Sequence, residues 1–194
     1  RTVEFISDLH LQPAEPATGT AVPAAGTLDG VTNVVFVLAD DLDWNLFEQV
    51  PRLAALQDKG MTFTHHTVTD SLCCPSRTSI LRGQYIHNHD VVSNLSTTGG
   101  GWPVFRDKGW HTDCLPTWLQ SAGIETALFG KYLNEYPATQ RPVDARYVPP
   151  GWTDWRGSVD HVHEEPDARE LQGGTYKYFD TTLSNNGRLE PHQG

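Results

Sequence analysis

The feature that most constrains the fold is an unbroken apolar run over residues 34–39, which two acidic residues follow at once. The run is built from β-branched, aromatic and other apolar side chains and does not alternate with polar ones. Such a run is typical of a strand covered on both faces, as in a parallel sheet. We therefore expect an inner strand here, with Asp40 and Asp41 at its carboxyl end.

Helical and extended patterns alternate along the rest of the chain. Apolar spacing predicts helices over residues 46–59, 76–81 and 115–121, and strands over 61–64 and 124–129. The Asn-Gly pair at 186–187 predicts a hairpin between residues 178–183 and 188–189. Residues 93–112, rich in Gly, Trp and Thr, are expected to form a loop. This order predicts an α/β fold with a mainly parallel sheet flanked by helices.

The two ends of the chain differ in character from its middle. Residues 12–30 mix Pro, Ala, Gly and Thr without a period, which is typical of a linker. We expect a flexible arm over residues 1–30 and a globular domain over residues 31–194. The chain stops soon after the hairpin, and so small a parallel sheet would leave an edge open. We therefore expect a domain that is truncated at its C-terminus.

Charge and cysteine content exclude several classes of protein. The 14 Lys and Arg against 24 Asp and Glu give a net charge of −10, which argues against a general nucleic-acid binder. No stretch approaches the roughly 18 apolar residues of a membrane span. Three cysteines, two of them adjacent, do not indicate a disulfide framework. No signal peptide is visible at Arg1; we expect a secreted or periplasmic protein and leave a cytoplasmic one open.

Asp40 and Asp41 are the first residues that could carry chemistry. Ligands of open α/β sheets lie beyond the carboxyl ends of strands, and paired carboxylates there suit Ca²⁺ or Mg²⁺. The alternative is a pair of solvated acids, or a cap for the helix that follows. Lys131 follows the second expected strand, at the same edge of the sheet, where it would suit an anionic substrate.

The second group is Cys73-Cys74-Pro75-Ser76-Arg77, which we expect at the start of a helix. A helix N-terminus attracts anions through free N–H groups, and Arg77 adds a fork suited to a tetrahedral oxyanion. The same surroundings would lower the pKa of a thiol and make it nucleophilic. The alternative is a buried cysteine pair beside a surface arginine.

This group resembles the Cys-x-Pro-Ser-Arg signature of the formylglycine-dependent sulfatases. Asp40-Asp41 resembles the first metal-binding pair of that family, and Gly130-Lys131 resembles its Gly-Lys element. The match runs in order from about residue 33 to about residue 188. The finer pattern is similar to the N-acetylglucosamine-6-sulfatase and heparan endosulfatase branch, through these motifs: Tyr85-Ile86-His87-Asn88-His89, Gly130-Lys131-Tyr132-Leu133-Asn134-Glu135-Tyr136 and Val148-Pro149-Pro150-Gly151-Trp152.

The resemblance implies a sulfuric ester hydrolase with an alkaline-phosphatase-like fold, acting on a sulfated carbohydrate or an aryl sulfate. It implies that a formylglycine-generating enzyme oxidises Cys73 to formylglycine. One hydroxyl of the hydrated aldehyde attacks sulfur and the alcohol leaves; the other then expels sulfate. Arg77, Lys131 and the helix N-terminus would stabilise the sulfuryl charge. Asp40, Asp41 and residue 73 would hold Ca²⁺ or Mg²⁺.

The chain also departs from the family pattern. Leu133 stands where many members have a histidine, which leaves His87 and His89 as candidates for the leaving-group acid. The family draws a second Asp-Asn or Asp-Gln metal pair from later in the chain. We therefore expect the 194-residue chain to be a poor sulfatase and only marginally stable.

Three other interpretations stay open. The chain could be a catalytically incomplete fragment or a carbohydrate-binding remnant in which tryptophans stack on sugars; the candidates are Trp102, Trp110, Trp152 and Trp155. It could be a metallophosphoesterase that uses Asp8 and His10, although the chain has no Gly-Asp dipeptide. It could hold zinc through His111, Cys114 and the Cys73-Cys74 pair, although this spacing matches no common finger.

Overall fold

The computed structural model describes residues 3–7, 33–137, 146–160, 179 and 181–192. The chain divides into two compact units, residues 1–71 and residues 72–194, and each is described by itself. Asp8, His10 and the Pro- and Ala-rich segment lie outside the described residues, and so does most of the region between residues 160 and 180. The boundary expected near residue 30 therefore stays a prediction.

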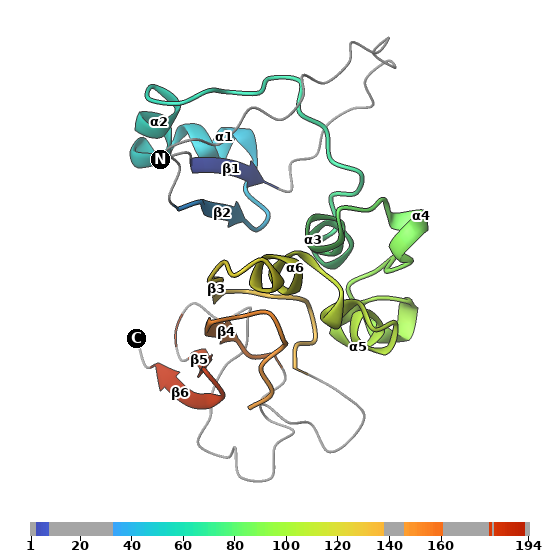
Figure 1. Cartoon of the computed structure of the whole chain (residues 1–194). Coiled ribbons are helices and arrows are strands. Elements are labelled where there is room, and N and C mark those ends of the chain that lie inside the picture. Colours follow the sequence, from blue (N-terminus) through green and yellow to red (C-terminus); the bar gives the residue numbers. More distant parts are fainter. Residues whose placement is uncertain (1–2, 8–32, 138–145, 161–178, 180, 193–194) are drawn as a thin grey trace. The chain divides into compact units, whose positions relative to one another are not determined.

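The first unit contains a small parallel sheet followed by two short helices (Figure 1). Strand β1 (Val3–Ser7) pairs in parallel with β2 (Val35–Ala39). Helix α1 (Trp44–Glu48) and helix α2 (Pro51–Gln57) come next. The single helix expected over residues 46–59 is therefore wrong. Proline lacks an N–H and is favoured at a first helical position, so Pro51 begins a new helix.

Strand β2 forms where the apolar run predicts it, but it is not buried. The side chain of Val35 is 58% exposed, and Val34, Phe36 and Val37 are exposed as well. Among the described residues, β2 pairs only with β1, so its apolar faces have little to cover them. The strand expected over residues 61–64 is absent from the described structure, where that stretch is irregular and finds no strand to pair with.

The second unit begins with a run of helices. The helices predicted over residues 76–81 and 115–121 are confirmed, although the first begins earlier, at Cys73. The region expected to be a loop contains a helix of its own, because Pro103 lies in a first turn, where proline favours a helix. The described helical segments are α3 (Cys73–Arg82), α4 (Ile86–His89), η1 (Ser96–Thr98), α5 (Gly101–Asp107), η2 (Trp110–Thr112) and α6 (Leu115–Ser121).

A four-stranded mixed sheet follows the helices, in the order β3-β4-β5-β6. Its strands are β3 (Ala127–Gly130), β4 (Asp154–Ser158), β5 (Thr181–Asn185) and β6 (Arg188–His192). β3 and β4 are parallel, whereas the other two pairings are antiparallel. The α/β class is thus found, but a mainly parallel sheet is not confirmed, because the hairpin adds antiparallel pairs. Asn186 and Gly187 have φ values of 50° and 85°, as the predicted Asn-Gly turn requires.

The core of the second unit is aromatic and joins the helices to the sheet. Trp102 on α5 and Trp155 on β4 are fully buried. Tyr132 and Tyr136, which follow β3, pack on them, with ring centroids 5.1 Å apart for Tyr132 and Trp155 and 5.3 Å apart for Tyr136 and Trp102. Two of the proposed sugar platforms are therefore core residues. The strand predicted over residues 124–129 is found as β3, which begins later, at Ala127, and its Phe129 is 66% exposed.

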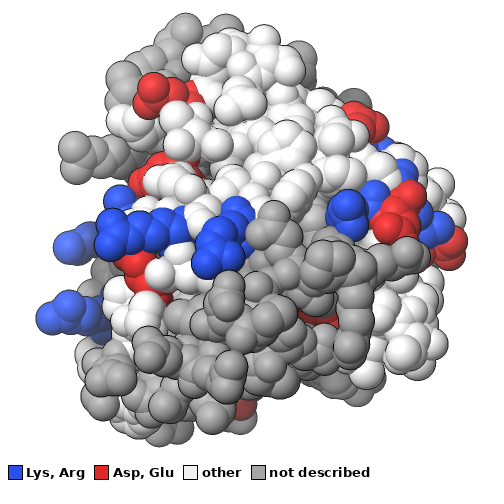
Figure 2. Space-filling view, turned by 90° about the horizontal axis from the view of Figure 1, so that it is seen from below, with Lys and Arg blue, Asp and Glu red and all other residues white. Residues whose placement is uncertain are grey.

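Charged side chains of both signs lie side by side on the face seen in Figure 2. Several described pairs are close in sequence or space, among them Lys108 with Asp90 at 2.7 Å and Arg188 with Glu190 at 3.7 Å. Within the described residues, no helix has the length and apolar character that crossing a bilayer requires.

Candidate active site

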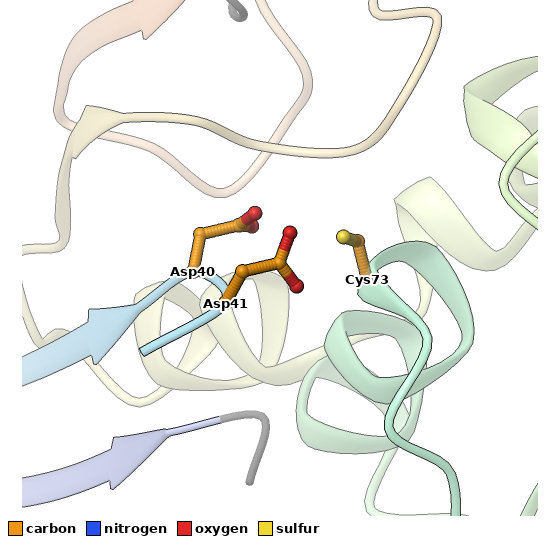
Figure 3. A group of neighbouring side chains, drawn as sticks. All are labelled: Asp40, Asp41 and Cys73. Atoms are coloured by element: carbon orange, nitrogen blue, oxygen red, sulfur yellow. The ribbon is translucent and has the colours of Figure 1, made fainter. Parts of the chain in front are cut away.

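Asp40 and Asp41 stand directly after β2, in the first unit. Asp41 has a φ of 53°, a left-handed conformation that turns the chain at this point. A carboxylate oxygen of Asp40 and one of Asp41 lie within 4.8 Å of each other. Figure 3 shows the two side chains turned to the same side. Both are exposed, and two adjacent carboxylates are donors that suit a hard cation.

The nearby Asp43 has a separate task. Its carboxylate accepts a hydrogen bond from the backbone N–H of Leu46 at 2.8 Å and caps α1. The sequence left open that Asp40 and Asp41 cap the following helix; in the structure Asp43 is the residue that caps it. Asp43 is thus the natural comparison residue for tests of Asp40 and Asp41.

Cys73 and Cys74 open helix α3, in the second unit, and their surroundings differ. Cys73, drawn in Figure 3 at the start of the helix, is 7% exposed. Cys74 is fully buried in the aromatic core, and this burial raises its pKa to about 11. Cys74 is therefore a packing residue. Both cysteines are buried, so the alternative of a buried cysteine pair is confirmed, and Cys73 is the first residue of the helix.

The first turn of α3 already uses most of its backbone N–H groups. The N–H of Cys74 donates to the side-chain Oδ1 of Asn94 at 2.8 Å, and the N–H of Ser76 donates to the carbonyl of Leu72 at 3.0 Å. Pro75 has no N–H. The expectation that this helix start presents free N–H groups to an anion is therefore wrong for these three positions.

Arg77 connects α3 to the Gly130-Lys131 element. Its Nη1 donates to the backbone carbonyl of Lys131 at 2.8 Å and to that of Tyr132 at 3.3 Å. The residue is 8% exposed, so the alternative of a surface arginine is wrong. Gly130 has a φ of 101°, which lets the chain turn out of β3 into Lys131. The structure thus brings the Cys-Pro-Ser-Arg helix and the Gly-Lys turn into direct contact.

The 93–102 segment joins the same two elements from the other side. Asn94 binds the start of α3, as described above. The N–H of Ser96 donates to the Glu135 carboxylate at 2.7 Å, and the N–H of Trp102 donates to the Asn134 carbonyl at 2.8 Å. Sequence reasoning missed Asn94, because a side chain that caps a helix 20 residues earlier in the chain leaves no local signal.

The two histidines considered as leaving-group acids differ sharply. His89 is fully buried; its Nδ1 accepts from the N–H of Val91 at 3.1 Å, and its Nε2 lies 3.0 Å from the Ser79 hydroxyl. Both ring nitrogens are thus engaged, which is a structural role. His87 is exposed and stacks on Tyr85 with ring centroids 5.7 Å apart. The structure assigns no acid role to His89.

The alternative zinc site does not form among the described residues. All three cysteines are free thiols, and no three of His111, Cys114, Cys73 and Cys74 bring ligand atoms together. The Cys114 thiol donates instead to the carbonyl of His111, with sulfur and oxygen 3.7 Å apart. Burial raises the pKa of Cys114 and lowers that of His111.

An α/β domain that carries Cys-x-Pro-Ser-Arg at a helix start and a Gly-Lys turn bonded to that helix is of the sulfatase class. The sulfatase family matches residues 32–188 of the chain. The chain therefore belongs to the sulfatase family. With it comes the alkaline-phosphatase-like α/β fold.

Curated relatives agree with this assignment. The chain is 35% identical over 167 residues to an extracellular sulfatase Sulf-1 homologue of Caenorhabditis elegans. The aligned region covers 84% of this chain and 20% of that relative. The chain is 37% identical to N-acetylglucosamine-6-sulfatase of Capra hircus (82% and 26%) and 34% identical to that of Homo sapiens (96% and 33%). The chain thus spans a fifth to a third of their length. No solved structure matched.

Proposed function

We propose that the chain contributes to the hydrolysis of sulfate esters, with Cys73, Arg77 and Lys131 as its catalytic residues. The observation that carries the proposal is the pair of hydrogen bonds from Arg77 to the carbonyls of Lys131 and Tyr132. They hold a guanidinium and the Gly-Lys turn against the helix that Cys73 begins. Two cationic residues beside a nucleophile suit an anionic sulfuryl group.

The nucleophile in this proposal is formylglycine, which a formylglycine-generating enzyme would produce from Cys73. When hydrated, that group supplies a hydroxyl to attack sulfur and a second hydroxyl whose loss of a proton releases sulfate. Arg77, held by its two carbonyl contacts, would place its positive charge beside the anion. Cys74 has no part in this step, because it is buried in the core with a raised pKa.

The metal in the proposal is Ca²⁺ or Mg²⁺, held by Asp40, Asp41 and the modified residue 73. The close, exposed carboxylates of Asp40 and Asp41 fit a hard cation better than zinc. The cation would neutralise charge on the sulfuryl oxygens. That Asp40 and Asp41 act together with Cys73 is part of the proposal and rests on the family to which the chain belongs.

A sulfated carbohydrate is the substrate class that we infer, with aryl sulfates as model substrates. Two relatives are named N-acetylglucosamine-6-sulfatases, and another is named an extracellular sulfatase. We propose a secreted or periplasmic protein on the same grounds. A carbohydrate-binding remnant without turnover is the second candidate, although buried Trp102 and Trp155 cannot serve it as sugar platforms.

The proposal can be tested on the chain produced together with a formylglycine-generating enzyme. Peptide mass spectrometry should find conversion at Cys73 and an intact thiol at Cys74. The converted chain, loaded with Ca²⁺, should hydrolyse an aryl sulfate and a 6-sulfated glucosamine, at the low rate expected of the 194-residue chain alone, and Cys73→Ala should remove this activity. The matched control is Cys114→Ala, which removes another buried thiol of the same unit, at the start of α6 rather than of α3.

Two results would contradict the proposal. Conversion at Cys74 would reverse the assignment of the nucleophile. A converted and metal-loaded chain that turns over neither substrate would rule out hydrolysis by this chain. If that chain still bound 6-sulfated glucosamine, the carbohydrate-binding interpretation would take its place.

A further inference from the structure

Asn94 occupies a position that its sequence context does not suggest. Asn94-Leu95-Ser96 is formally a glycosylation sequon, which would favour a solvent-facing amide. In the structure the residue is half-buried, and its Oδ1 accepts the N–H of Cys74 at 2.8 Å. The residue that precedes α3, Leu72, has no side chain able to cap the helix, and no cap hydrogen bond is made by it. Asn94 supplies this cap from a distant part of the chain.

The cap matters because of what it is attached to. Asn94 belongs to the 93–102 segment, which is bonded to residues 134 and 135 through Ser96 and Trp102. Residues 131 and 132 are in turn bonded to Arg77 of α3. A closed ring of contacts therefore runs from the start of α3 through Asn94 to the Gly-Lys turn, and back to α3 through Arg77.

We propose that Asn94 is a positioning residue, which caps α3 and holds Cys73 in register with Arg77 and the Gly130-Lys131 turn. It does not touch the reacting atoms. Without it, the first turn of α3 frays at the end that carries Cys73, while Arg77 still holds the helix one turn further along. Only the expected effect of Asn94 on catalysis rests on the proposed function. The cap itself can be measured on the unconverted chain.

The cap can be observed directly through amide exchange. Labelling cysteine with ¹⁵N gives three amide signals, from Cys73, Cys74 and Cys114, and Cys74→Ser identifies the relevant one. In the unconverted chain, Asn94→Leu removes the acceptor at nearly constant volume, whereas Asn94→Asp keeps one. We expect Asn94→Leu to speed exchange of the Cys74 amide roughly tenfold or more. Asn94→Asp should keep exchange slow, because aspartate caps helices as well as asparagine does.

Two further readouts, cysteine alkylation and steady-state kinetics, and one control variant separate positioning from general stability. Alkylation of Cys73 should become faster in Asn94→Leu, whereas alkylation of Cys114, in the core near α6, should not. Ser96→Ala removes the sequon and keeps the backbone N–H that binds Glu135, so it should leave the alkylation rates of Cys73 and Cys114 unchanged. In the converted chain, Asn94→Leu should lower kcat for an aryl sulfate more than it changes KM, and Asn94→Asp should restore kcat.

The outcomes are distinct. An equally protected Cys74 amide in Asn94→Leu would overturn the proposal, whatever the activity. If alkylation of Cys114 also becomes faster in Asn94→Leu, that variant has unfolded and the test passes to Asn94→Asp. Slow exchange of the Cys74 amide in Asn94→Asp then supports the cap, and fast exchange overturns it. Absence of sulfatase activity in every variant would instead contradict the proposed function and leave the exchange result standing.

Discussion

Replacing Arg77 by lysine tests whether the contact between α3 and the Gly-Lys turn is structural as well as chemical. The guanidinium donates to two carbonyls from an almost fully buried position. A hydrogen bond from a charged donor contributes roughly 1.5–3 kcal/mol, and the bond at 3.3 Å is the weaker one. A lysine ammonium lacks the planar fork and can reach at most one carbonyl well. We therefore expect Arg77→Lys to lower the free energy of unfolding by about 2–4 kcal/mol.

Urea denaturation of the unconverted chain, followed by tryptophan fluorescence, measures this loss without reference to catalysis. For a chain of this length it corresponds to a fall in Tm of roughly 5–15 °C. The matched control is Arg188→Lys on β6, whose side chain is 84% exposed and 3.7 Å from Glu190; it should leave stability unchanged. Equal stability of Arg77→Lys and the unmutated chain would refute the reasoning, because the buried carbonyls would then have lost the guanidinium donor without cost.

Three more perturbations follow from the structure. Asp40→Asn or Asp41→Asn should weaken Ca²⁺ binding in titration calorimetry, and unchanged affinity in both would remove the pair from the metal site. Burial lowers the pKa of His111 in the folded chain from its ordinary value of 6.5. As the pH falls, the imidazole is therefore protonated in the unfolded chain before the folded one. The free energy of unfolding should be full above about pH 6.5 and fall as the pH drops below it. His111→Asn should flatten this dependence in thermal melts, and an unaltered slope would contradict it. Gly151→Ala places a Cβ 2.6 Å from the N of Thr117, at a φ of 93°, and should cost roughly 1–3 kcal/mol in urea denaturation; a stable variant would contradict it.

Local signals in the sequence predicted local structure well. The Asn186-Gly187 pair predicted the turn of the hairpin, and Pro75, favoured in a first turn, predicted a helix at α3. Each of these rests on backbone preferences within a few residues. The break at Pro51 was also a local signal, but the apolar spacing on both sides of it favoured one continuous helix.

Properties that depend on distant partners were not predictable in the same way. An apolar run such as residues 34–39 predicts a strand, but its burial depends on which other segments cover it. The sheet is mixed rather than mainly parallel because β5 and β6 pair antiparallel with their neighbours in it. Of the candidate site, the residue types and their order were readable, whereas the cap from Asn94 required the fold to bring residue 94 beside Cys74.

In the proposed function the backbone and the side chain of Lys131 have separate tasks, which gives a final prediction. Arg77 binds the carbonyl of Lys131, which any residue at this position provides. The amides of Cys74 and Ser76 are already bonded, and in the proposed function the Lys131 ammonium is one of the side-chain charges that stabilise the sulfuryl group. Lys131→Gln keeps the carbonyl and removes the charge.

We therefore expect Lys131→Gln to lower the free energy of unfolding by less than about 1 kcal/mol, a surface-type effect. In the converted, metal-loaded chain it should nevertheless reduce kcat/KM for an aryl sulfate by roughly 100-fold, as the loss of one charge-stabilising donor does elsewhere. Arg77→Lys should lower both quantities. If Lys131→Gln instead destabilised the chain as much as Arg77→Lys while turnover persisted, the lysine side chain would be structural. The sulfuryl charge would then have to be met by Arg77 and the cation alone.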